Sequence, residues 1–475
     1  MKLSELASTG RHPGEPLLLE LGNQSLHVLQ WLRVLPGRRY VAKARWQKRL
    51  VLAKIFVGAK AERNQRLERT GVQLLFEQHM NTPELLADQQ QRGEGGWILF
   101  EFLEQAEGLG AQWRAIVQQP PLTEAQYELL KRALEAIAKL HRHGLWQADL
   151  HLDNLLVKHG DLYLVDGADI RAKNPGQALS LDQVLDNLGL FFAQLPATFD
   201  AHLEPLLTSY QRHGGSPELS LDRLQRHIHK AREWRLRDLL DKSGRDCSLF
   251  AVKRTAQGLQ AVRREWLERL TPILQNPDAA IAQGERLKSG NSATVALIEV
   301  DGQPLVIKRY NIKSLGHWLR RCWRPSRAWH SWQQAIWLEI FGIDTACPLA
   351  VLEERSLGLR RRSFLITEYL DGENILTRFA PWQDGSVPEP ELAALQSLFE
   401  ALGPGRIQHG DMKGSNIFWQ HDHWALIDLD GARHCKSASQ FANAHYQDIG
   451  RFLRNWPATS PLHQQLQQLL SADDG

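Results

Sequence analysis

One set of polar residues occurs twice in this chain at the same spacing. The set is an aspartate, an asparagine five positions later, and a second aspartate twelve positions after that. Its two copies are Asp149, Asn154 and Asp166 in the first half, and Asp411, Asn416 and Asp428 in the second. An aspartate can accept the proton of a hydroxyl group, and an asparagine with a second aspartate supplies oxygen ligands for Mg²⁺. The spacing predicts magnesium-dependent chemistry at a hydroxyl group in each half.

A lysine lies upstream of each set, inside a strand pattern. Lys54 lies within Val51–Phe56, and Lys308 lies within Val306–Tyr310. Transfer of a phosphoryl group from ATP needs a lysine on the nucleotide phosphates, besides the aspartate at the acceptor and the two ligands of Mg²⁺. Both halves supply all four residue types in the same order, which indicates phosphoryl transfer.

Matching helix and strand patterns must position these residues. An amphipathic helix pattern precedes each set, beginning with a capping box at Thr123 in the first half and running through Leu392–Leu402 in the second. A short apolar run that ends in aspartate follows each asparagine, Leu162–Asp166 and Trp424–Asp428. Such a run is typical of a buried strand with a carboxylate at its tip. Two copies of one fold explain these patterns, with a boundary near 240–245.

The order and spacing resemble the protein-kinase-like fold over most of both halves. The resemblance implies an α+β class with two tandem kinase-like domains, 1–242 and 243–475, each with a small β-rich N-lobe and a mostly helical C-lobe. It implies these roles: Lys54 and Lys308 on the phosphates of ATP, Asp149 and Asp411 as catalytic bases, Asn154, Asp166, Asn416 and Asp428 as ligands of Mg²⁺, and Asp186 and Asp448 as buried braces of the catalytic loop.

The nucleotide side differs between the halves. Ser289–Val295, with Gly290, is a candidate phosphate-covering loop in the second half, and a plain hairpin turn is the alternative. The first half has only Pro36–Arg39, which favours an ordinary turn. The lysine's usual glutamate partner is predicted as Glu68 in the first half, whereas the corresponding position in the second half is Ser331. Glu77 and Glu339 are the fallback candidates in the two halves.

The acceptor side differs too. His409 and Lys413 in the second half correspond to Gln147 and His151 in the first. A lysine two positions after the base can neutralise charge on the transferring phosphoryl group, and a solvated surface lysine is the alternative. These differences favour activity in the second half, with the first half either active or a regulatory pseudokinase.

The second half also resembles the bacterial lipopolysaccharide kinase family. The resembling segments are Arg245–Phe250, Val306–Asn311, the basic stretch to Arg327, Gly342–Thr345, Pro348–Ala350 and His409–Ile417. Enzymes of that family phosphorylate heptose or Kdo sugars of the lipopolysaccharide inner core. The resemblance implies ATP and Mg²⁺ as cofactors, the lipopolysaccharide core glycolipid as acceptor, and the cytoplasmic surface of the inner membrane as the place of action.

Two basic segments that contain tryptophan suit such an acceptor. The first carries Arg309, Lys313, Arg320, Arg321 and Arg324, interleaved with Trp318 and Trp323. Arginine makes bidentate contacts with phosphate, and tryptophan favours the membrane interface. The second segment, Lys230–Lys242, predicts either an interfacial helix or an interdomain helix with a solvated charged face.

Composition limits the remaining possibilities. The net charge of +3 over 475 residues gives no reason to expect a nucleic-acid partner. The N-terminus lacks the apolar segment of a secretory signal, and no stretch approaches the ~20 apolar residues of a membrane span. The four cysteines have no metal-ligand spacing, which favours reduced thiols. We therefore expect a cytoplasmic protein that is peripheral at the inner membrane.

Three other functions fit parts of the sequence. A small-molecule kinase of the aminoglycoside or choline type is favoured by the run from Asp149 to His151. A protein Ser/Thr kinase is favoured by Lys413, but no Ala-Pro-Glu signature follows Asp166 or Asp428. A non-enzymatic scaffold is disfavoured because both halves keep the aspartate and asparagine, and a regulatory pseudokinase pair remains an alternative.

Overall fold

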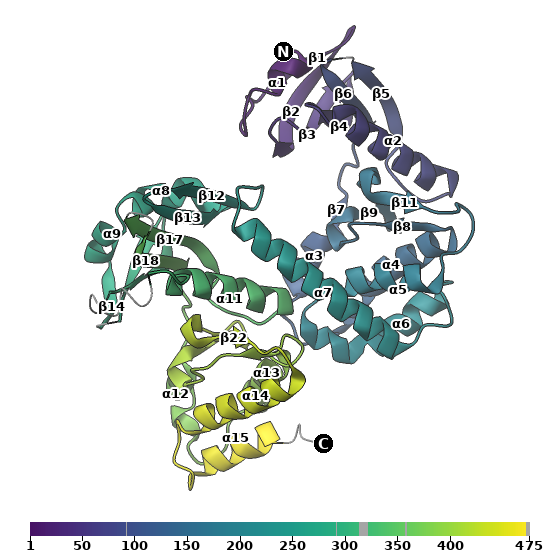
Figure 1. Cartoon of the computed structure of the whole chain (residues 1–475). Coiled ribbons are helices and arrows are strands. Elements are labelled where there is room, and N and C mark those ends of the chain that lie inside the picture. The colour runs from purple at the N-terminus through teal and green to yellow at the C-terminus, as the bar shows by residue number, and fades with distance from the viewer. Residues whose placement is uncertain (92, 291, 313–321, 357–358, 472–475) are drawn as a thin grey trace. The chain divides into compact units, whose positions relative to one another are not determined.

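The computed structural model describes residues 1–91, 93–290, 292–312, 322–356 and 359–471 (Figure 1). Contacts divide the chain into two compact units. Unit 1 is Met1–Gln194 with Ala201–Ile228, and unit 2 is Leu195–Asp200 with His229–Gly475. The division falls inside helix α7 (Leu221–Ser243), upstream of the boundary predicted after residue 242. The domain limits themselves stay a prediction.

Unit 1 begins with a six-stranded antiparallel sheet in the order β1-β2-β3-β4-β6-β5. The elements of this part are α1 (Leu3–Leu6), β1 (Leu17–Leu21), β2 (Gln24–Leu35), β3 (Arg39–Trp46), β4 (Arg49–Phe56), α2 (Ala61–Glu77), β5 (Leu85–Gln91) and β6 (Gly95–Glu101). Side chains alternate between the faces of a strand. On β4, Val51 and Ala53 therefore enter the core with Tyr40, while the other face carries Lys54.

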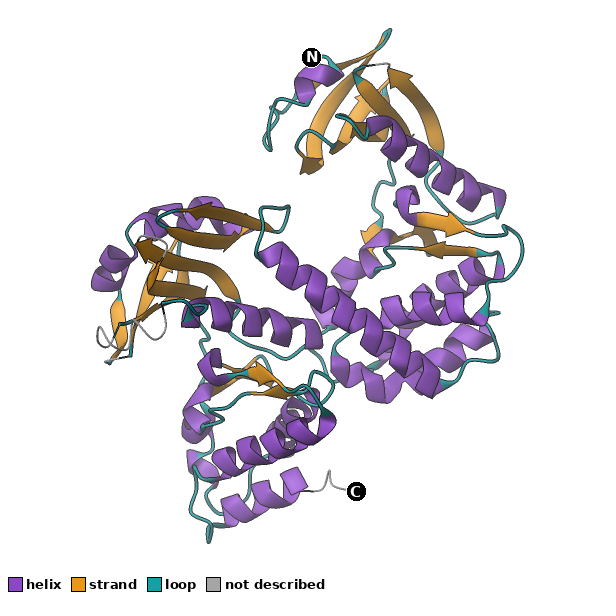
Figure 2. Ribbon diagram, viewed as in Figure 1, coloured by secondary structure: helices purple, strands orange, loops and turns teal. Residues whose placement is uncertain are grey.

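The rest of unit 1 is mostly helical (Figure 2). Its helices are α3 (Leu109–Ile116), α4 (Glu124–Arg142), α5 (Leu181–Phe192) and α6 (Leu203–Arg212), with short strands β7 (Glu107–Gly108), β8 (Leu145–Gln147), β9 (Leu155–Lys158), β10 (Asp161–Leu164) and β11 (Ile170–Ala172). The predicted capping box is present at the start of α4, where Thr123 and Gln126 exchange hydrogen bonds. This helix supports the β8 end that leads to Asp149.

Unit 2 has a seven-stranded sheet in the order β12-β13-β17-β18-β16-β15-β14. The elements of this part are β12 (Phe250–Thr255), β13 (Gly258–Arg263), α8 (Leu267–Gln275), α9 (Pro277–Gln283), β14 (Glu285–Ser289), β15 (Ala293–Val300), β16 (Gln303–Tyr310), α11 (Arg327–Phe341), β17 (Pro348–Ser356) and β18 (Leu359–Glu368). One face of the sheet packs against α8 and α9, through Leu270 and Ile281. The other face packs against α11 through Trp332 and Ile336.

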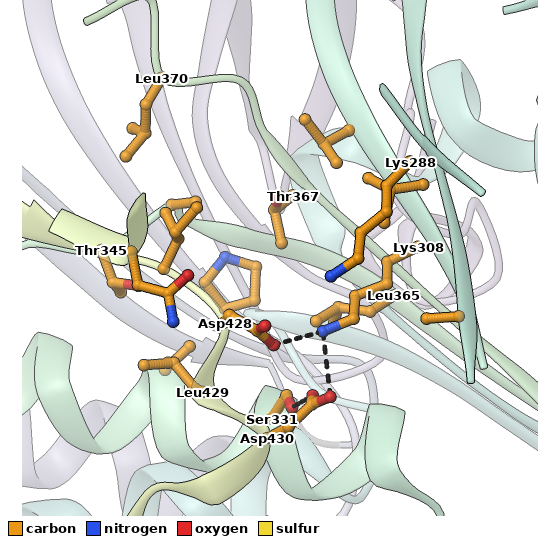
Figure 3. A pocket seen from close by; sticks show the side chains of 18 of the residues that line it. Lys288, Lys308, Ser331, Thr345, Leu365, Thr367, Leu370, Asp428, Leu429 and Asp430 are labelled. Carbon is orange, nitrogen blue, oxygen red and sulfur yellow. Dashed lines mark hydrogen bonds and ion pairs between the residues drawn. The ribbon is translucent and has the colours of Figure 1, made fainter. Parts of the chain in front are cut away.

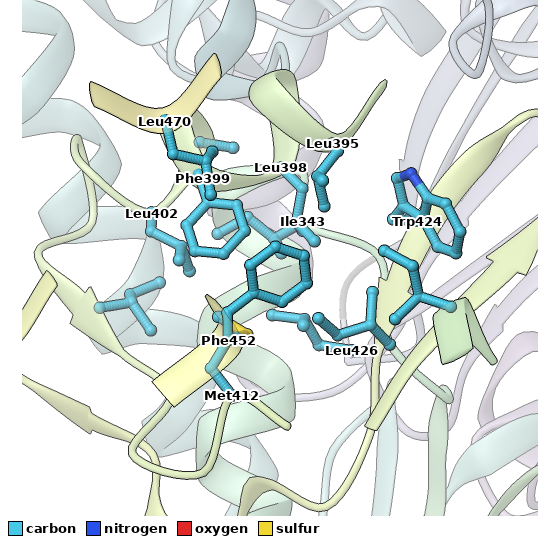
Figure 4. Close-up of a cluster of buried hydrophobic side chains, with 14 of the residues drawn as sticks. Ile343, Leu395, Leu398, Phe399, Leu402, Met412, Trp424, Leu426, Phe452 and Leu470 are labelled. Atoms are coloured by element: carbon cyan, nitrogen blue, oxygen red, sulfur yellow. The ribbon is translucent and has the colours of Figure 1, made fainter. Parts of the chain in front are cut away.

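The remainder of unit 2 is again mostly helical. It contains α12 (Ile375–Arg378), α13 (Glu389–Ala401), β19 (Ile407–Gln408), β20 (Ile417–Gln420), β21 (His423–Leu426), β22 (Arg433–His434), α14 (Ala438–Leu453) and α15 (Pro461–Ser471). Phe399 of α13 and Phe452 of α14 pack edge to face beside Leu426, as Figure 4 shows. Met412 is in the same core, so packing anchors the loop that carries Asp411.

Each unit therefore combines an antiparallel sheet with a mostly helical part, which confirms the predicted α+β class. The central strands of the two sheets also share one register: Lys54 lies opposite Val41, and Lys308 lies opposite Val295. Among the described residues, no helix has the length and apolarity that a bilayer crossing requires.

Candidate active site

In unit 2, a cavity of about 460 Å³ lies between the sheet and the helical part (Figure 3). Its volume falls in the range typical of small-molecule sites, about 300–1,000 Å³. The sheet contributes Lys308 and apolar side chains such as Leu365, and the loops of the helical part contribute Lys413, Asn416 and Asp428. The structure therefore brings together four of the residues that the spacing singled out.

Lys308 lies between two carboxylates. Its Nζ is 2.6 Å from Oδ1 of Asp428 and 3.1 Å from Oδ2 of Asp430. Asp428 is in the left-handed region, with φ 61° and ψ 59°. The buried strand β21 ends at Leu426, so this backbone conformation turns the carboxylate from the strand tip toward the lysine.

Asp430 is a site residue that the sequence reasoning missed. It accepts hydrogen bonds from the hydroxyl groups of Tyr310 (2.6 Å) and Ser331 (2.8 Å), and it also pairs with Arg327. Burial alone would raise the pKa of Asp430, but Lys308 and these donors lower it below its ordinary value. A signal existed in the sequence, since the second half has an aspartate two positions after its predicted metal ligand where the first half has Ala168.

In unit 1 the lysine takes its partner from a helix. Nζ of Lys54 is 2.6 Å from Oε1 of Glu68 on α2, the predicted partner, and 3.1 Å from Oδ1 of Asp166. Glu68 also accepts backbone N–H groups of Gly167 and Ala168. Burial alone would lower the pKa of Lys54, but the carboxylates of Glu68 and Asp166 raise it above its ordinary value.

The two units thus take the second carboxylate partner of the site lysine from different elements. Unit 1 has Glu68 on its helix and Ala168 in the loop, whereas unit 2 has Ser331 on its helix and Asp430 in the loop. Each lysine keeps two carboxylate partners. The missing glutamate of the second half is therefore compensated by Asp430.

The loops that carry the predicted bases have the same internal hydrogen bonds. Nδ2 of Asn416 donates to the carbonyl oxygen of Asp411 at 3.0 Å, and Nδ2 of Asn154 donates to that of Asp149 at 2.9 Å. These bonds direct each amide nitrogen toward its own loop, which leaves the amide oxygen for a cation.

The side chains of Asn416 and Asp428 fit Mg²⁺ in their chemistry. Asn416 and Asp428 both line the cavity and offer hard oxygen ligands. No cluster of three or more His, Cys, Asp or Glu side chains suited to a metal occurs in the described part of the chain. Mg²⁺ does not need one, because it commonly takes one or two protein ligands and completes its shell with phosphate oxygens and water.

The acceptor side is cationic in unit 2. Oδ2 of Asp411 is 2.8 Å from Nζ of Lys413, and Oδ1 is 3.6 Å from Nε of Arg451, which the sequence reasoning did not single out. Burial alone would raise the pKa of Asp411, but Lys413 and Arg451 lower it. In unit 1, the side chain of Asp149 is 66% exposed and lies 3.9 Å from His151.

The replacement of histidine by glutamine leaves the unit 1 loop supported. Nε2 of Gln147 donates to the carbonyl oxygen of Val165 at 2.9 Å. Nε2 of His409 contacts the corresponding carbonyl oxygen of Ile427 at 3.0 Å, and its burial lowers the pKa of this histidine. Both side chains therefore fix the strand end that precedes the predicted metal ligand.

The brace of the catalytic loop is an aspartate only in unit 2. Asp448 is buried, and its carboxylate accepts the backbone N–H groups of His409 (2.7 Å) and Gly410 (3.0 Å). Burial raises the pKa of Asp448 to about 6. The prediction of Asp186 for this position in unit 1 is wrong, because its side chain is 64% exposed and contacts His227.

Asn187, one residue further on, takes the place of the brace in unit 1. It is buried, donates to the carbonyl oxygen of Gln147 at 2.8 Å, and contacts His141 at 3.0 Å. A second pair of residues supports the alignment of Asn187 with Asp448. Gln194 and Asn455 each lie seven residues after the brace of their unit, and they accept a backbone N–H of the catalytic loop at 3.0 and 3.1 Å. The equal spacing of the two aspartates was thus misleading by one position.

The candidate phosphate loop forms the β14–β15 hairpin. The backbone N–H of Gly290 donates to the carbonyl oxygen of Ala293 at 3.1 Å, which closes the turn. Leu287, Lys288, Ser292 and Ala293 line the cavity, whereas Gly290 does not. A phosphate-covering role for Gly290 stays a prediction.

Few residues of the first basic segment, from Arg309 to Arg324, are both described and exposed. Lys313, Trp318, Arg320 and Arg321 lie outside the described residues. Arg309 pairs with Asp278 at 2.6 Å, so its guanidinium is used within unit 2. Of the described members, Trp323 is 75% exposed and Arg324 is exposed as well.

The interfacial reading of Lys230–Lys242 is not supported by the packing of this segment. Arg232 is buried and makes two hydrogen bonds to Asp200, at 2.8 and 2.9 Å. Leu236 is buried and Leu240 packs beside it in the core of unit 2. The apolar face formed by Leu236 and Leu240 is therefore not accessible to a bilayer. Trp234, in contrast, is exposed.

Comparison with known proteins gave a match to one family model and matches among solved structures. Residues 283–472 match the model of the Lipopolysaccharide kinase (Kdo/WaaP) family. A solved structure of WaaP in complex with acyl carrier protein aligns with 44% of this chain and 86% of that one, at 19% identity and a TM-score of 0.32. No match was found among curated proteins. The matched segment contains all the candidate site residues of unit 2.

Proposed function

We propose that unit 2 phosphorylates a sugar of the lipopolysaccharide inner core, because residues 283–472 match the model of the Lipopolysaccharide kinase (Kdo/WaaP) family. The acceptor in this proposal is a hydroxyl group of a heptose or Kdo residue. The observation that carries it is the convergence of Lys308, Lys413, Asn416 and Asp428 on one cavity, beside the loop of Asp411.

Lys308 binds the phosphates of ATP in this proposal. Its pairs with Asp428 and Asp430 hold the ammonium group at the base of the cavity before the nucleotide arrives. Asn416 and Asp428 would hold Mg²⁺, which when bound would neutralise charge on the phosphate oxygens. The apolar lining, which includes Val295, suits the nucleobase.

Asp411 orients the acceptor hydroxyl and takes its proton. The acceptor oxygen forms a bond to the terminal phosphorus of ATP as the bond from that phosphorus to the bridging oxygen breaks, so ADP leaves. Asp411 is ionised at neutral pH and can therefore accept a proton, and Lys413 and Arg451, which lower its pKa, stabilise the ionised form. Lys413 and Arg451 place two positive charges at this end, which favours an acceptor that carries phosphate or carboxylate groups.

We also propose that unit 1 is a second copy of the kinase-like domain, with the limits 1–242 and 243–475. The support is the shared register of Lys54 and Lys308, the shared loop hydrogen bonds, and the left-handed backbone of Asp166 (φ 65°) and Asp428 (φ 61°). Unit 1 keeps the residues for a nucleotide but lacks the cationic surroundings of Asp411. We therefore assign transfer to the lipopolysaccharide core to unit 2.

The place of action in this proposal is the cytoplasmic surface of the inner membrane, where such an acceptor would be met. The exposed Trp323 and the adjacent Arg324 suit a bilayer interface. Binding to vesicles with anionic lipids, measured for Trp323→Ala beside the unchanged chain, tests this part separately.

An acceptor panel tests the function. The full-length chain is incubated with Mg²⁺ and ATP radiolabelled on the terminal phosphate, in the presence of dephosphorylated lipopolysaccharide core, choline, an aminoglycoside or a serine-containing peptide. We expect label on the glycolipid. Label on choline or the aminoglycoside would replace this assignment with the small-molecule kinase, and no transfer to any acceptor would contradict the kinase proposal for this chain.

A further inference from the structure

A second positive charge lies in register with the site lysine of unit 2, two strands away. Lys288 on β14 lies opposite Val295 on β15, and Val295 lies opposite Lys308 on β16. Residues directly opposite each other in antiparallel strands project from the same face. All three line the cavity, and Figure 3 shows Lys288 and Lys308 extending into the same space.

Unit 1 has the same arrangement with arginine in place of lysine. Arg33 on β2 lies opposite Val41 on β3, and Val41 lies opposite Lys54 on β4. Burial alone would raise the pKa of Asp166, but Lys54, Arg39 and, as the smallest of these contributions, Arg33 lower it, so Arg33 lies close enough to act on that carboxyl. The two hairpins differ in sequence, yet both place a cation at this position.

A β-bulge precedes the cation in each hairpin. The register shifts between Arg286 and Lys288 in unit 2, and between Trp31 and Arg33 in unit 1. The residues passed over are leucines, Leu287 and Leu32. Bulges redirect side chains and are frequent next to active sites. Here the bulge brings the cation into line with the site lysine.

Neither cation is used to stabilise the fold. Lys288 and Arg33 are exposed, and neither makes a hydrogen bond or ion pair within the residues that the structure describes. In unit 2, Lys308 and Arg327 already balance the two nearby carboxylates, Asp428 and Asp430. A second lysine directed into the same cavity adds positive charge, which suits a polyanionic ligand.

We propose that Lys288, and Arg33 in unit 1, bind the phosphate chain of the nucleotide from the hairpin side, facing Lys308 and Lys54. Neighbouring strands are about 4.8 Å apart, so the backbones that carry the two charges are roughly 10 Å apart and long side chains can hold a polyphosphate between them. A glycine-rich loop normally contacts these phosphates with backbone N–H groups. The β14–β15 turn contains one glycine, Gly290. In this proposal the ammonium group of Lys288 replaces part of the phosphate contact that a glycine-rich loop would make. This inference rests on the proposed use of ATP.

Nucleotide binding without any acceptor tests the inference. Affinities for ADP and AMP, each with Mg²⁺, are measured by calorimetry on the full-length chain carrying Lys54→Met, which weakens the unit 1 site. We expect Lys288→Ala to weaken ADP binding about tenfold, as for loss of one charge-assisted contact, and AMP binding less than about twofold. Lys288→Arg should retain the affinity for ADP.

A matched control is available on the same strand. Arg286 lies opposite Ala296, which is buried on the other face of the sheet, so Arg286→Ala removes an equal charge directed away from the cavity. We expect no change in ADP binding for this variant. The reciprocal measurement uses Arg33→Ala in a Lys308→Met chain, with Arg49→Ala as the control.

The outcomes separate this inference from the proposed function. Equal losses for ADP and AMP, no loss for Lys288→Ala, or an equal loss for Arg286→Ala would each overturn it. An unaltered chain that binds neither nucleotide would overturn both proposals. A selective loss of ADP binding, with no label on lipopolysaccharide core in the acceptor panel, would support the inference and contradict the acceptor assignment alone.

Discussion

The carboxylate position beside the site lysine gives the most specific prediction about unit 2. Asp430→Ala removes a side chain that is 15% exposed and has four partners, namely Lys308, Tyr310, Ser331 and Arg327. Lys308 keeps Asp428 as a partner, but the hydroxyl groups of Tyr310 and Ser331 lose a charged acceptor. We expect unit 2 to be destabilised and phosphoryl transfer to fall.

The magnitude follows from these contacts. A buried donor left without its acceptor costs about 1–3 kcal/mol, and breaking a largely buried ion pair by removing one partner costs about 3–5 kcal/mol in total. Because Asp430 retains some exposure and Lys308 retains one partner, we expect about 3 kcal/mol, the low end of that range. Two-unit chains do not unfold in one step, so the assay is hydrogen exchange of unit 2 peptides at increasing urea concentration.

A designed exchange makes the prediction sharper. Unit 1 has Phe56, Glu68 and Ala168 at the positions of Tyr310, Ser331 and Asp430. The triple variant Tyr310→Phe, Ser331→Glu, Asp430→Ala therefore gives unit 2 the arrangement of unit 1. We expect it to recover most of the lost stability, and part of the lost activity, because the carboxylate introduced by Ser331→Glu can reach the lysine from α11 as Glu68 does from α2.

The control is Glu299→Ala, which removes one exposed negative charge from β15 of the same sheet. It should change the free energy of unfolding by less than about 0.5 kcal/mol. A loss below about 1 kcal/mol for Asp430→Ala, or a triple variant no better than Asp430→Ala, would refute the argument that the carboxylate has changed position.

Three further predictions concern the braces and the base. Asn187→Ala should destabilise unit 1 by about 2 kcal/mol because it leaves buried polar partners unpaired, whereas Asp186→Ala should cost under about 1 kcal/mol; hydrogen exchange measures both. The carboxyl of Asp448 has a pKa of about 6 in the folded state and the ordinary value of 3.8 in the unfolded state. Between pH 3.8 and about pH 6 the unfolded state has therefore lost this proton while the folded state still holds it, so the free energy of unfolding falls as pH rises. The total fall is at most about 3 kcal/mol, which is the free-energy equivalent of this pKa shift. Asp448→Asn should abolish the fall when the free energy of unfolding is measured across that pH range. Arg451→Met should raise the pKa of Asp411 and move the acid limb of kcat/KM to higher pH.

Each of these has a result that contradicts it. Equal losses for the Asn187 and Asp186 variants would restore the alignment suggested by spacing. An unchanged pH slope in Asp448→Asn would mean that this carboxyl keeps its ordinary pKa. An acid limb that stays in place in Arg451→Met, while Lys413→Ala also leaves it unmoved, would remove the argument that these cations hold Asp411 ionised.

The sequence was sufficient for the parts of the site that depend on local spacing. The distance from Asp411 to Asn416 spans one loop, and that from Asn416 to Asp428 spans a two-stranded turn, so residue types and intervals predict their meeting. Glu68 was also found, since one helix of fixed length separates it from the following strand. Local geometry determines all of these relations.

The sequence was insufficient where different elements meet. Asp430 compensates for Ser331 only because a loop and a helix distant in sequence pack together, which no interval encodes. Asp186 was predicted because it repeats the 20-residue interval from Asp428 to Asp448. The prediction failed because one position along a helix turns a side chain by about 100°, and it is Asn187 that contacts the loop. Lys288 depends on a bulge, which changes the register of a strand without an obvious change in composition.

The central claim is that unit 2 performs phosphoryl transfer to the lipopolysaccharide core, with Asp411 as its base. The most direct measurement compares Asp411→Asn and Asp149→Asn in the full-length chain, with radiolabelled ATP, Mg²⁺ and dephosphorylated lipopolysaccharide core, after calorimetry has shown that both variants still bind ADP. The account predicts that Asp411→Asn loses at least about 100-fold in label transfer, as for loss of a general base, while Asp149→Asn keeps most of it. Full transfer by Asp411→Asn, or its loss in Asp149→Asn alone, would contradict the account.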